Sequence, residues 1–304
     1  MNNPTHTSPD HFGNLMERLR HSPLKRVALV CPDDTHTQYV IERALQEGIA
    51  RFSLYGGPSV LPAIERLAGQ HAGDVSITRC ASPDDAARQA VRAVRNRHAD
   101  VLMKGTINTD NLLRAVLDKE AGLLQPGSVL THVAIASLPV APGLIVFTDA
   151  AVIPQPTTEQ LDAMLRRAVE TSRQLGTERP RVALTHCTEK TSAKFPVTLS
   201  YGELVRRALR GCYGHVDVGG PMDVRTALDA SSAQLKRIAS PVAGRADVLV
   251  FPDIEAANTF YKTITLLGCG PVAGMLCGTV APVVVASRAD SGESKLCSLA
   301  VALL

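Results

Sequence analysis

The chain of 304 residues is predicted to form an α/β fold with a mainly parallel sheet. Short apolar runs rich in β-branched residues alternate along it with stretches of helical periodicity, which is the pattern of successive βαβ units. A composition of 45% hydrophobic and 20% charged residues is sufficient for a proper core and argues against disorder. At roughly 100–200 residues per domain, the length corresponds to one large domain or two ordinary ones.

Strands are expected where a short run is apolar throughout, and helices where apolar residues recur at every third or fourth position. In chain order, this predicts strands at 26–31, 51–55, 75–80, 101–104, 144–148, 181–185, 215–218, 248–251, 272–277 and 282–286. Helices are expected between most of these strands, for example at 37–46, 84–97, 109–119, 158–175 and 255–267.

Prolines cluster at 139–143 and 153–157, which makes these segments the best candidates for a crossing between domains. We therefore expect a discontinuous first α/β domain, residues 1–140 plus 278–304, and a second α/β domain, residues 141–277. A cleft between two such domains is a natural place for a ligand.

Composition excludes several classes of function. The net charge of +3 is too small to make nucleic acid the main partner, and 4% aromatic residues without tryptophan argue against base-stacking platforms. No apolar run approaches the ~20 residues of a membrane helix, so no membrane association is expected. The N-terminal segment lacks the basic start and apolar core of a signal peptide, so we expect a cytoplasmic protein. Seven cysteines without C-x-x-C spacing indicate reduced thiols and no metal site.

The end of the chain has the most informative local pattern. The apolar run 282–286 leads into Ser287 and Arg288, and a helical pattern follows. Asp290 and Glu293 have capping-box spacing, so a helix should begin near Asp290 or Ser291. Ser287 and Arg288 would then lie at a strand-to-helix turn, where backbone N–H groups, the helix dipole and a guanidinium favour an anion. A turn of this kind can also carry Ser and Arg for capping alone.

A second turn of the same kind follows the strand at 101–104. Lys104, Thr106 and Thr109 offer donors there, although the G-x-x-x-x-G-K pattern of a Walker A loop is missing. An ordinary capped helix with one surface lysine remains the alternative. Arg114 lies four residues from both Asp110 and Asp118, so an intrahelical ion pair is its default interpretation.

Three further residues are weaker candidates for ligand binding. Asp149 ends the strand at 144–148 and would either face a cleft or cap a turn. Asn258 and Lys262 lie four apart on one helix face, where a solvated lysine is the commoner case. The glycines at 268–274 follow a helix and precede a strand, which is the wrong context for a dinucleotide loop, and Gly268 is expected to cap a helix.

Several ordered motifs together resemble the phosphate acetyl/butyryltransferase family, nearest to its butyryl branch. The resemblance extends from about Lys25 to the C-terminus and rests on residues 102–105, 109, 113–120, 148–152, 240–247, 251–258, 261–262, 287–291 and 293–295.

The resemblance implies a two-domain fold like that of isocitrate and isopropylmalate dehydrogenases, with the active site in an inter-domain cleft. It implies reversible acyl transfer between coenzyme A and inorganic phosphate, with coenzyme A as substrate, no tightly bound cofactor and a homo-oligomeric assembly. Ser287 and Arg288 match the family's catalytic pair, and Arg114 matches an arginine that helps to bind phosphate or coenzyme A.

Two departures from the family pattern leave the chemistry open. The proposed catalytic base of the acetyltransferases is an aspartate that falls near Ser294 here, so the nearby carboxylates Asp290 and Glu293 become the candidates and Glu293 is taken as the catalytic one. Gly219 replaces a common aspartate. A catalytically weak protein that binds coenzyme A or acyl phosphate for regulation is therefore the alternative to a phosphate acyltransferase, and a decarboxylating dehydrogenase is a more distant one.

Overall fold

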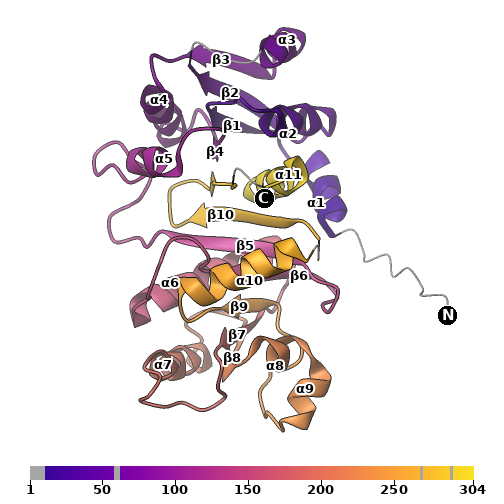
Figure 1. Ribbon diagram of the computed structural model, residues 1–304, viewed down its shortest axis with the longest axis vertical. Helices are drawn as coiled ribbons and strands as arrows, with labels where there is room; N and C mark the ends of the chain where they lie inside the picture. The colour runs from indigo at the N-terminus through magenta and orange to yellow at the C-terminus, as the bar shows by residue number, and fades with distance from the viewer. Residues whose placement is uncertain (1–10, 58–61, 268–269, 288–289) are drawn as a thin grey trace, which may run out of the picture.

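The computed structural model describes residues 11–57, 62–267, 270–287 and 290–304. Its described strands form one eleven-stranded sheet in the order β3-β2-β1-β4-β11-β10-β5-β6-β9-β7-β8, which extends along the whole molecule (Figure 1). The strands are β1 (Lys25–Val30), β2 (Ala50–Gly56), β3 (Val75–Arg79), β4 (Val101–Lys104), β5 (Thr131–Ser137), β6 (Leu144–Thr148), β7 (Arg181–Thr185), β8 (Asp217–Met222), β9 (Val248–Val250), β10 (Val272–Cys277) and β11 (Val283–Val284).

Helices cover both faces of this sheet. They are α1 (His11–Arg20), α2 (Thr35–Gln46), α3 (Pro62–Gln70), α4 (Pro83–Arg95), α5 (Thr109–Val116), α6 (Thr158–Gln174), α7 (Val197–Leu209), α8 (Val224–Leu228), α9 (Ala230–Leu235), α10 (Ile254–Leu266) and α11 (Gly292–Ala302). One continuous core holds the apolar sides of α1, α2, α6, α7 and α11. The opposite face has two cores, one under α4 and α5 and one under α8 and α10.

Strand direction divides the sheet into two halves. The strands from β3 to β11 are parallel to one another, and so are β6, β9, β7 and β8. Between them, β10 and β5 pair antiparallel with their neighbours. Three successive reversals make β6 run opposite to β11, so the carboxyl ends of the two halves lie at opposite edges of the sheet.

The α/β class and the mainly parallel sheet expected from the sequence are confirmed. The central strand β5 was not anticipated, and the helix expected to reach Lys119 ends at Val116. The division into domains at residues 140 and 278 stays a prediction, and the sheet continues across both positions. No helix within the described ranges is long and apolar enough to cross a membrane.

The capping box expected at Asp290 and Glu293 is wrong. Ser291 is the N-cap of α11, and its hydroxyl accepts a hydrogen bond from the Ser294 backbone N–H. The Asp290 carboxylate instead accepts from the Ser287 backbone N–H, because it closes the turn before the helix. The helix nevertheless begins where the pattern indicated. Gly268, expected as a helix cap, lies outside the described residues.

Candidate active site

The strand order creates a topological switch point at β1. The chain leaves β1 for β2 on one side and returns through β3 to β4 on the other, so β1 and β4 are neighbours whose connections diverge. In open α/β sheets, ligands bind in the crevice at the carboxyl ends of the strands at such a point. We use "switch-point edge" for the loops 31–34 and 105–108 and the described residues 285–287 and 290–291, which follow β1, β4 and β11.

The two strand-to-helix turns singled out in the sequence are neighbours at this edge. β11 pairs parallel with β4, and Val284 is opposite Met103. Ser287 therefore leaves the sheet one strand away from the loop that begins at Gly105, about 4.8 Å away in strand spacing. The sequence indicated each turn separately, and only strand pairing brings them together.

Residues of the β4 loop are fixed against the end of β1. Thr106 donates to the Cys31 carbonyl from its backbone N–H at 2.9 Å and from its hydroxyl at 3.2 Å. Lys104 is buried, and its ammonium donates to the Gly105 carbonyl at 3.3 Å. A Cβ on Gly105 would overlap the Cys31 carbonyl oxygen and lie 2.6 Å from that of Val30. The glycine is therefore required by packing against β1 rather than by the approach of a ligand.

The helix that follows this loop begins at exposed residues. Thr109 is exposed at the start of α5, and the N-cap Asn108 makes no side-chain capping hydrogen bond. Uncapped N–H groups and the helix dipole favour negative charge at such an end.

The β11 turn is tightly constrained within the described residues. The Ser287 backbone N–H donates to the Asp290 carboxylate at 2.7 Å, and the Asp290 N–H donates back to the Ser287 carbonyl at 3.1 Å. Glu293 accepts a hydrogen bond from the Tyr39 hydroxyl of α2 at 2.9 Å. Arg288, the second member of the expected catalytic pair, lies outside the described residues.

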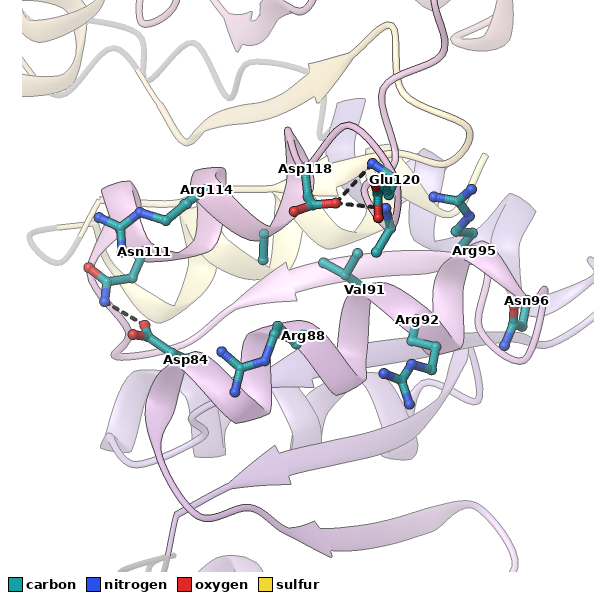
Figure 2. Close-up of a pocket in the computed structure, with 12 residues that line it drawn as sticks. Asp84, Arg88, Val91, Arg92, Arg95, Asn96, Asn111, Arg114, Asp118 and Glu120 are labelled. Atoms are coloured by element: carbon teal, nitrogen blue, oxygen red, sulfur yellow. Dashed lines mark hydrogen bonds between the residues drawn. The ribbon is translucent and has the colours of Figure 1, made fainter.

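Arg114 lines a pocket of about 630 Å³ between α4 and α5. Figure 2 shows Arg88, Arg92 and Arg95 along α4, and Arg114 beside Asn111 on α5. The expected ion pair with Asp110 or Asp118 is wrong, since Arg114 takes part in no ion pair of the described residues.

Asp118 has other partners. Its carboxylate accepts from the backbone N–H groups of Ala121 and Glu120, which lower its pKa. Because Asp118 is engaged with the backbone, the exposed guanidinium of Arg114 is left to face the pocket.

Asp149, Asn258 and Lys262 belong to the other half of the sheet. The Asp149 carboxylate is buried and accepts four hydrogen bonds, two from the backbone N–H groups of the following turn and two from the start of β5. Asn258 donates to the Ala150 carbonyl at 2.9 Å, which joins α10 to that turn. The Lys262 ammonium lies 4.8 Å from the centre of the Tyr261 ring. The carboxyl end of β6 is at the sheet edge opposite Ser287, so Asp149 is not brought to the switch-point edge.

Sequence reasoning missed the loop after β1. Asp33 lies there, and its Oδ1 is buried without a hydrogen-bond partner among the described residues. Burial and the adjacent Asp34 raise the pKa of the Asp33 carboxyl. Two consecutive aspartates directly after a buried apolar run were the available signal, because a run of this kind ends at the ligand-binding edge of a parallel sheet.

Taken together, a topological switch point, adjacent strand-to-helix turns and an arginine-lined pocket define an α/β protein suited to phosphate-bearing ligands. The chain belongs to the phosphate acetyl/butyryltransferase family of acyltransferases. The family model described as "Phosphate acetyl/butaryl transferase" matches residues 63–303. The family resemblance expected from the sequence is therefore confirmed.

Individual relatives agree with this assignment. The chain is 34% identical over 97% of both chains to a phosphate butyryltransferase from Clostridium beijerinckii. It is 33% identical to a phosphate acetyltransferase from Thermotoga maritima, over 91% of this chain and 94% of that one. The crystal structure of a branched-chain phosphotransacylase from Enterococcus faecalis superposes with a TM-score of 0.81 at 30% identity, over 92% of this chain and 98% of that one.

Proposed function

We propose that this protein transfers a short acyl group, butyryl or similar, reversibly between coenzyme A and inorganic phosphate. The observation that carries the proposal is the adjacency of the β4 and β11 turns at the switch-point edge. Two neighbouring loops rich in donors, one leading into a helix N-terminus, suit a site where phosphate and a carbonyl oxygen are bound side by side.

The proposed chemistry needs charge stabilisation more than covalent catalysis. When phosphate attacks the thioester, the carbonyl oxygen gains negative charge, and preorganised donors lower the barrier. We assign this role to Ser287 and Arg288, with Lys104, Thr106 and Thr109 near the phosphate and Glu293 as a candidate base. No acyl-serine is required, because direct displacement at the carbonyl carbon suffices.

Coenzyme A itself carries phosphate groups, and the pocket beside Arg114 suits them. Four arginines along two facing helices present forked donors to phosphate oxygens. The pocket begins near the first turns of α4 and α5, where Asn111 donates to Asp84 at 2.6 Å, and extends away from the edge. We propose that it holds the phosphate-bearing end of coenzyme A while the thiol reaches the switch-point edge.

The remaining parts of the proposal concern the location of the protein, its assembly, its domains and the role of coenzyme A. We propose a cytoplasmic homo-oligomer with a ligand cleft between domains 1–140 plus 278–304 and 141–277. Asn258 and Lys262 would then act from the second domain, where Asn258 joins α10 to the loop after β6. Asp149 would hold that loop in place through its hydrogen bonds from the backbone N–H groups of Ala151 and Val152. We propose coenzyme A as a substrate rather than a bound cofactor. The named transferases among the relatives favour catalysis over the regulatory alternative.

The test is a panel of acyl-CoA substrates from acetyl to hexanoyl, assayed with and without phosphate by loss of thioester absorbance. We expect turnover that requires phosphate and is fastest near butyryl. Turnover that ignores phosphate would indicate a thioesterase, and tight binding of coenzyme A without turnover would indicate the regulatory alternative. Arg288→Ala should reduce the rate strongly, whereas an Arg288→Ala protein with full activity would remove the main catalytic assignment.

A further inference from the structure

The described part of the β11 turn lacks an obvious proton acceptor for the thiol of coenzyme A. A serine, Ser294, stands where the family resemblance places a catalytic aspartate. The two nearby carboxylates already have other partners. Asp290 accepts from the Ser287 backbone N–H, and Glu293 accepts from the Tyr39 hydroxyl. Since a thiol titrates near 8–9, its attack on an acyl phosphate at neutral pH benefits from a positioned base.

In the described loop after β1, the Asp33 carboxyl group has an oxygen without such a partner. Its Oδ1 is buried, and the described residues offer it no hydrogen-bond donor. A buried acceptor left unsatisfied costs about 1–3 kcal/mol, and a charged one costs more. A carboxyl group held at such a cost is a candidate for a functional role.

The position of Asp33 fits that role. It follows β1 at the switch point, and its own backbone N–H donates to the Cys31 carbonyl at 2.9 Å. The same carbonyl accepts both hydrogen bonds from Thr106, so the Asp33 loop and the β4 loop are joined. On the other side, Asp34 lies 3.6 Å from the ammonium of Lys295 in the first turn of α11.

Strand spacing gives the scale of the site. β1 and β11 are separated by β4, which puts them about 10 Å apart. A thioester carbonyl together with a phosphate group can occupy that width. The loops after the three strands are therefore close enough to act on one reacting centre, with Asp33 on the side of β1 and Ser287 on the side of β11.

We propose that Asp33 is the catalytic group that exchanges a proton with the thiol of coenzyme A. In the direction of thioester formation, the Asp33 carboxylate takes the S–H proton while sulfur attacks the acyl carbon. The bond between that carbon and the phosphate oxygen breaks, and its electron pair stays with phosphate. The proton on Asp33 then passes to the departing phosphate, which leaves as hydrogen phosphate, so no further reactant is needed.

The surroundings favour such an exchange. Burial, and then the charge of Asp34, raise the pKa of Asp33 towards that of a group that can both take and return a proton. Other titratable groups at this edge include Cys31 on the same loop, Lys104 at the end of β4, Asp290 in the β11 turn and Lys295 on α11. Burial also raises the pKa of the Cys31 thiol to about 11, so Cys31 stays uncharged at neutral pH.

Asp33→Asn is the decisive variant, with Asp34→Asn as the matched control. The control removes the same charge from the same loop and keeps a good N-cap for α2. For Asp33→Asn, we expect kcat for butyryl phosphate and coenzyme A to fall by about 10²–10⁴-fold. The wild-type rate should fall at low pH as Asp33 is protonated, and this acidic limb of the pH–rate profile should be lost in Asp33→Asn. Asp34→Asn should keep that limb but move it to lower pH, because a like charge beside Asp33 has been removed.

The stability of Asp33→Asn distinguishes a catalytic role of Asp33 from a structural one. Because the pKa of Asp33 is raised in the folded state, its charged form opposes folding above that pKa, and the opposition disappears as the pH falls through it. Asp33→Asn should therefore unfold in urea at the same or a higher midpoint than the wild type at neutral pH. A lower midpoint would mean that Asp33 supports the fold, and would contradict the proposal.

The proposal rests on the proposed acyltransferase function, and the two fail in different ways. Wild-type protein without phosphate-dependent turnover contradicts both. Active wild type together with an equally active Asp33→Asn protein contradicts the Asp33 assignment alone. If Glu293→Gln loses the acidic limb of the pH–rate profile and Asp33→Asn keeps it, the Asp33 assignment is contradicted as well. If Asp33→Asn does not fold, the pH–rate profile of Asp34→Asn is the test. An acidic limb at the same pH as in the wild type would overturn the assignment.

Discussion

Replacing Gly105 by alanine should destabilise the protein and the switch-point edge together. The added Cβ would overlap the Cys31 carbonyl oxygen and lie 2.6 Å from that of Val30. Both are backbone atoms of a buried strand end, so neither can rotate aside. They are also the acceptors for the backbone N–H groups of Gly105 and Thr106, at 2.8 and 2.9 Å.

The expected magnitude follows from these contacts. Two to three hydrogen bonds at about 1 kcal/mol each are weakened, including that of the Thr106 hydroxyl. Inserting a methyl group into a packed site adds about 1–3 kcal/mol. We therefore expect Gly105→Ala to lower the free energy of unfolding by about 3–6 kcal/mol. That is a large part of the 5–15 kcal/mol typical of a folded protein.

Urea unfolding followed by circular dichroism measures this loss, and Gly73→Ala is the matched control. A Cβ on Gly73 meets no atom within 4 Å. This control should change stability by less than about 0.5 kcal/mol. Any folded Gly105→Ala protein should also have reduced turnover, because the loops after β1 and β4 are joined there. A loss below 1 kcal/mol would show that the two loops separate easily, and would refute the fixed edge on which the site depends.

Three further predictions concern the pocket, the second half of the sheet and pH. Arg114→Ala should weaken the binding of coenzyme A, measured by calorimetry, by about 10–150-fold, because the loss of one hydrogen bond to a charged group corresponds to a change of this size. Unchanged affinity would show that the pocket is not part of the site. Asp149→Asn should lower the free energy of unfolding by about 2–6 kcal/mol in urea, because an amide nitrogen cannot accept and two of the four donors lose their acceptor; a neutral effect would contradict this arrangement. Backbone donors lower the pKa of Asp118, so its contribution to stability is present above about pH 4 and is lost as the pH falls further. The difference in urea midpoint between wild type and Asp118→Ala should accordingly shrink from pH 6 to pH 3, and a constant difference would argue against this coupling.

Periodicity located the individual elements well where the local pattern was strong. The helix beginning near Ser291 was placed correctly because a cap and a helical pattern lie next to each other in the chain. β5 was missed although it lies at the centre of the sheet. Its run 131–137 has Thr131, His132 and Ser137 at its ends, which leaves only the four apolar residues 133–136 between them. In the structure, Thr131 and the backbone of His132 are satisfied by the Asp149 carboxylate, a contact that no local pattern contains.

The same limit applies to single residues of the site. Arg114 has two carboxylates at helical spacing in the sequence, which favours an ion pair. That helix ends at Val116, and Asp118 is taken up by backbone N–H groups, so the ion pair does not form. The sequence offered a signal for the loop that contains Asp33 and Asp34, but it could not show which of the two has an unpaired oxygen, because that depends on neighbours contributed by distant segments.

The sequence alone determined the α/β class, the strand-to-helix turns after 101–104 and 282–286, and the family, because these depend on residues close together in the chain. Tertiary structure decided the order and direction of the strands. Strand order is set by hydrogen bonds and packing between segments far apart in the sequence, here β4 against β11 and β10 against β5. That order places Ser287 and Asp33 at one edge of the sheet, and the reversals at β10 and β5 place Asp149 at the other.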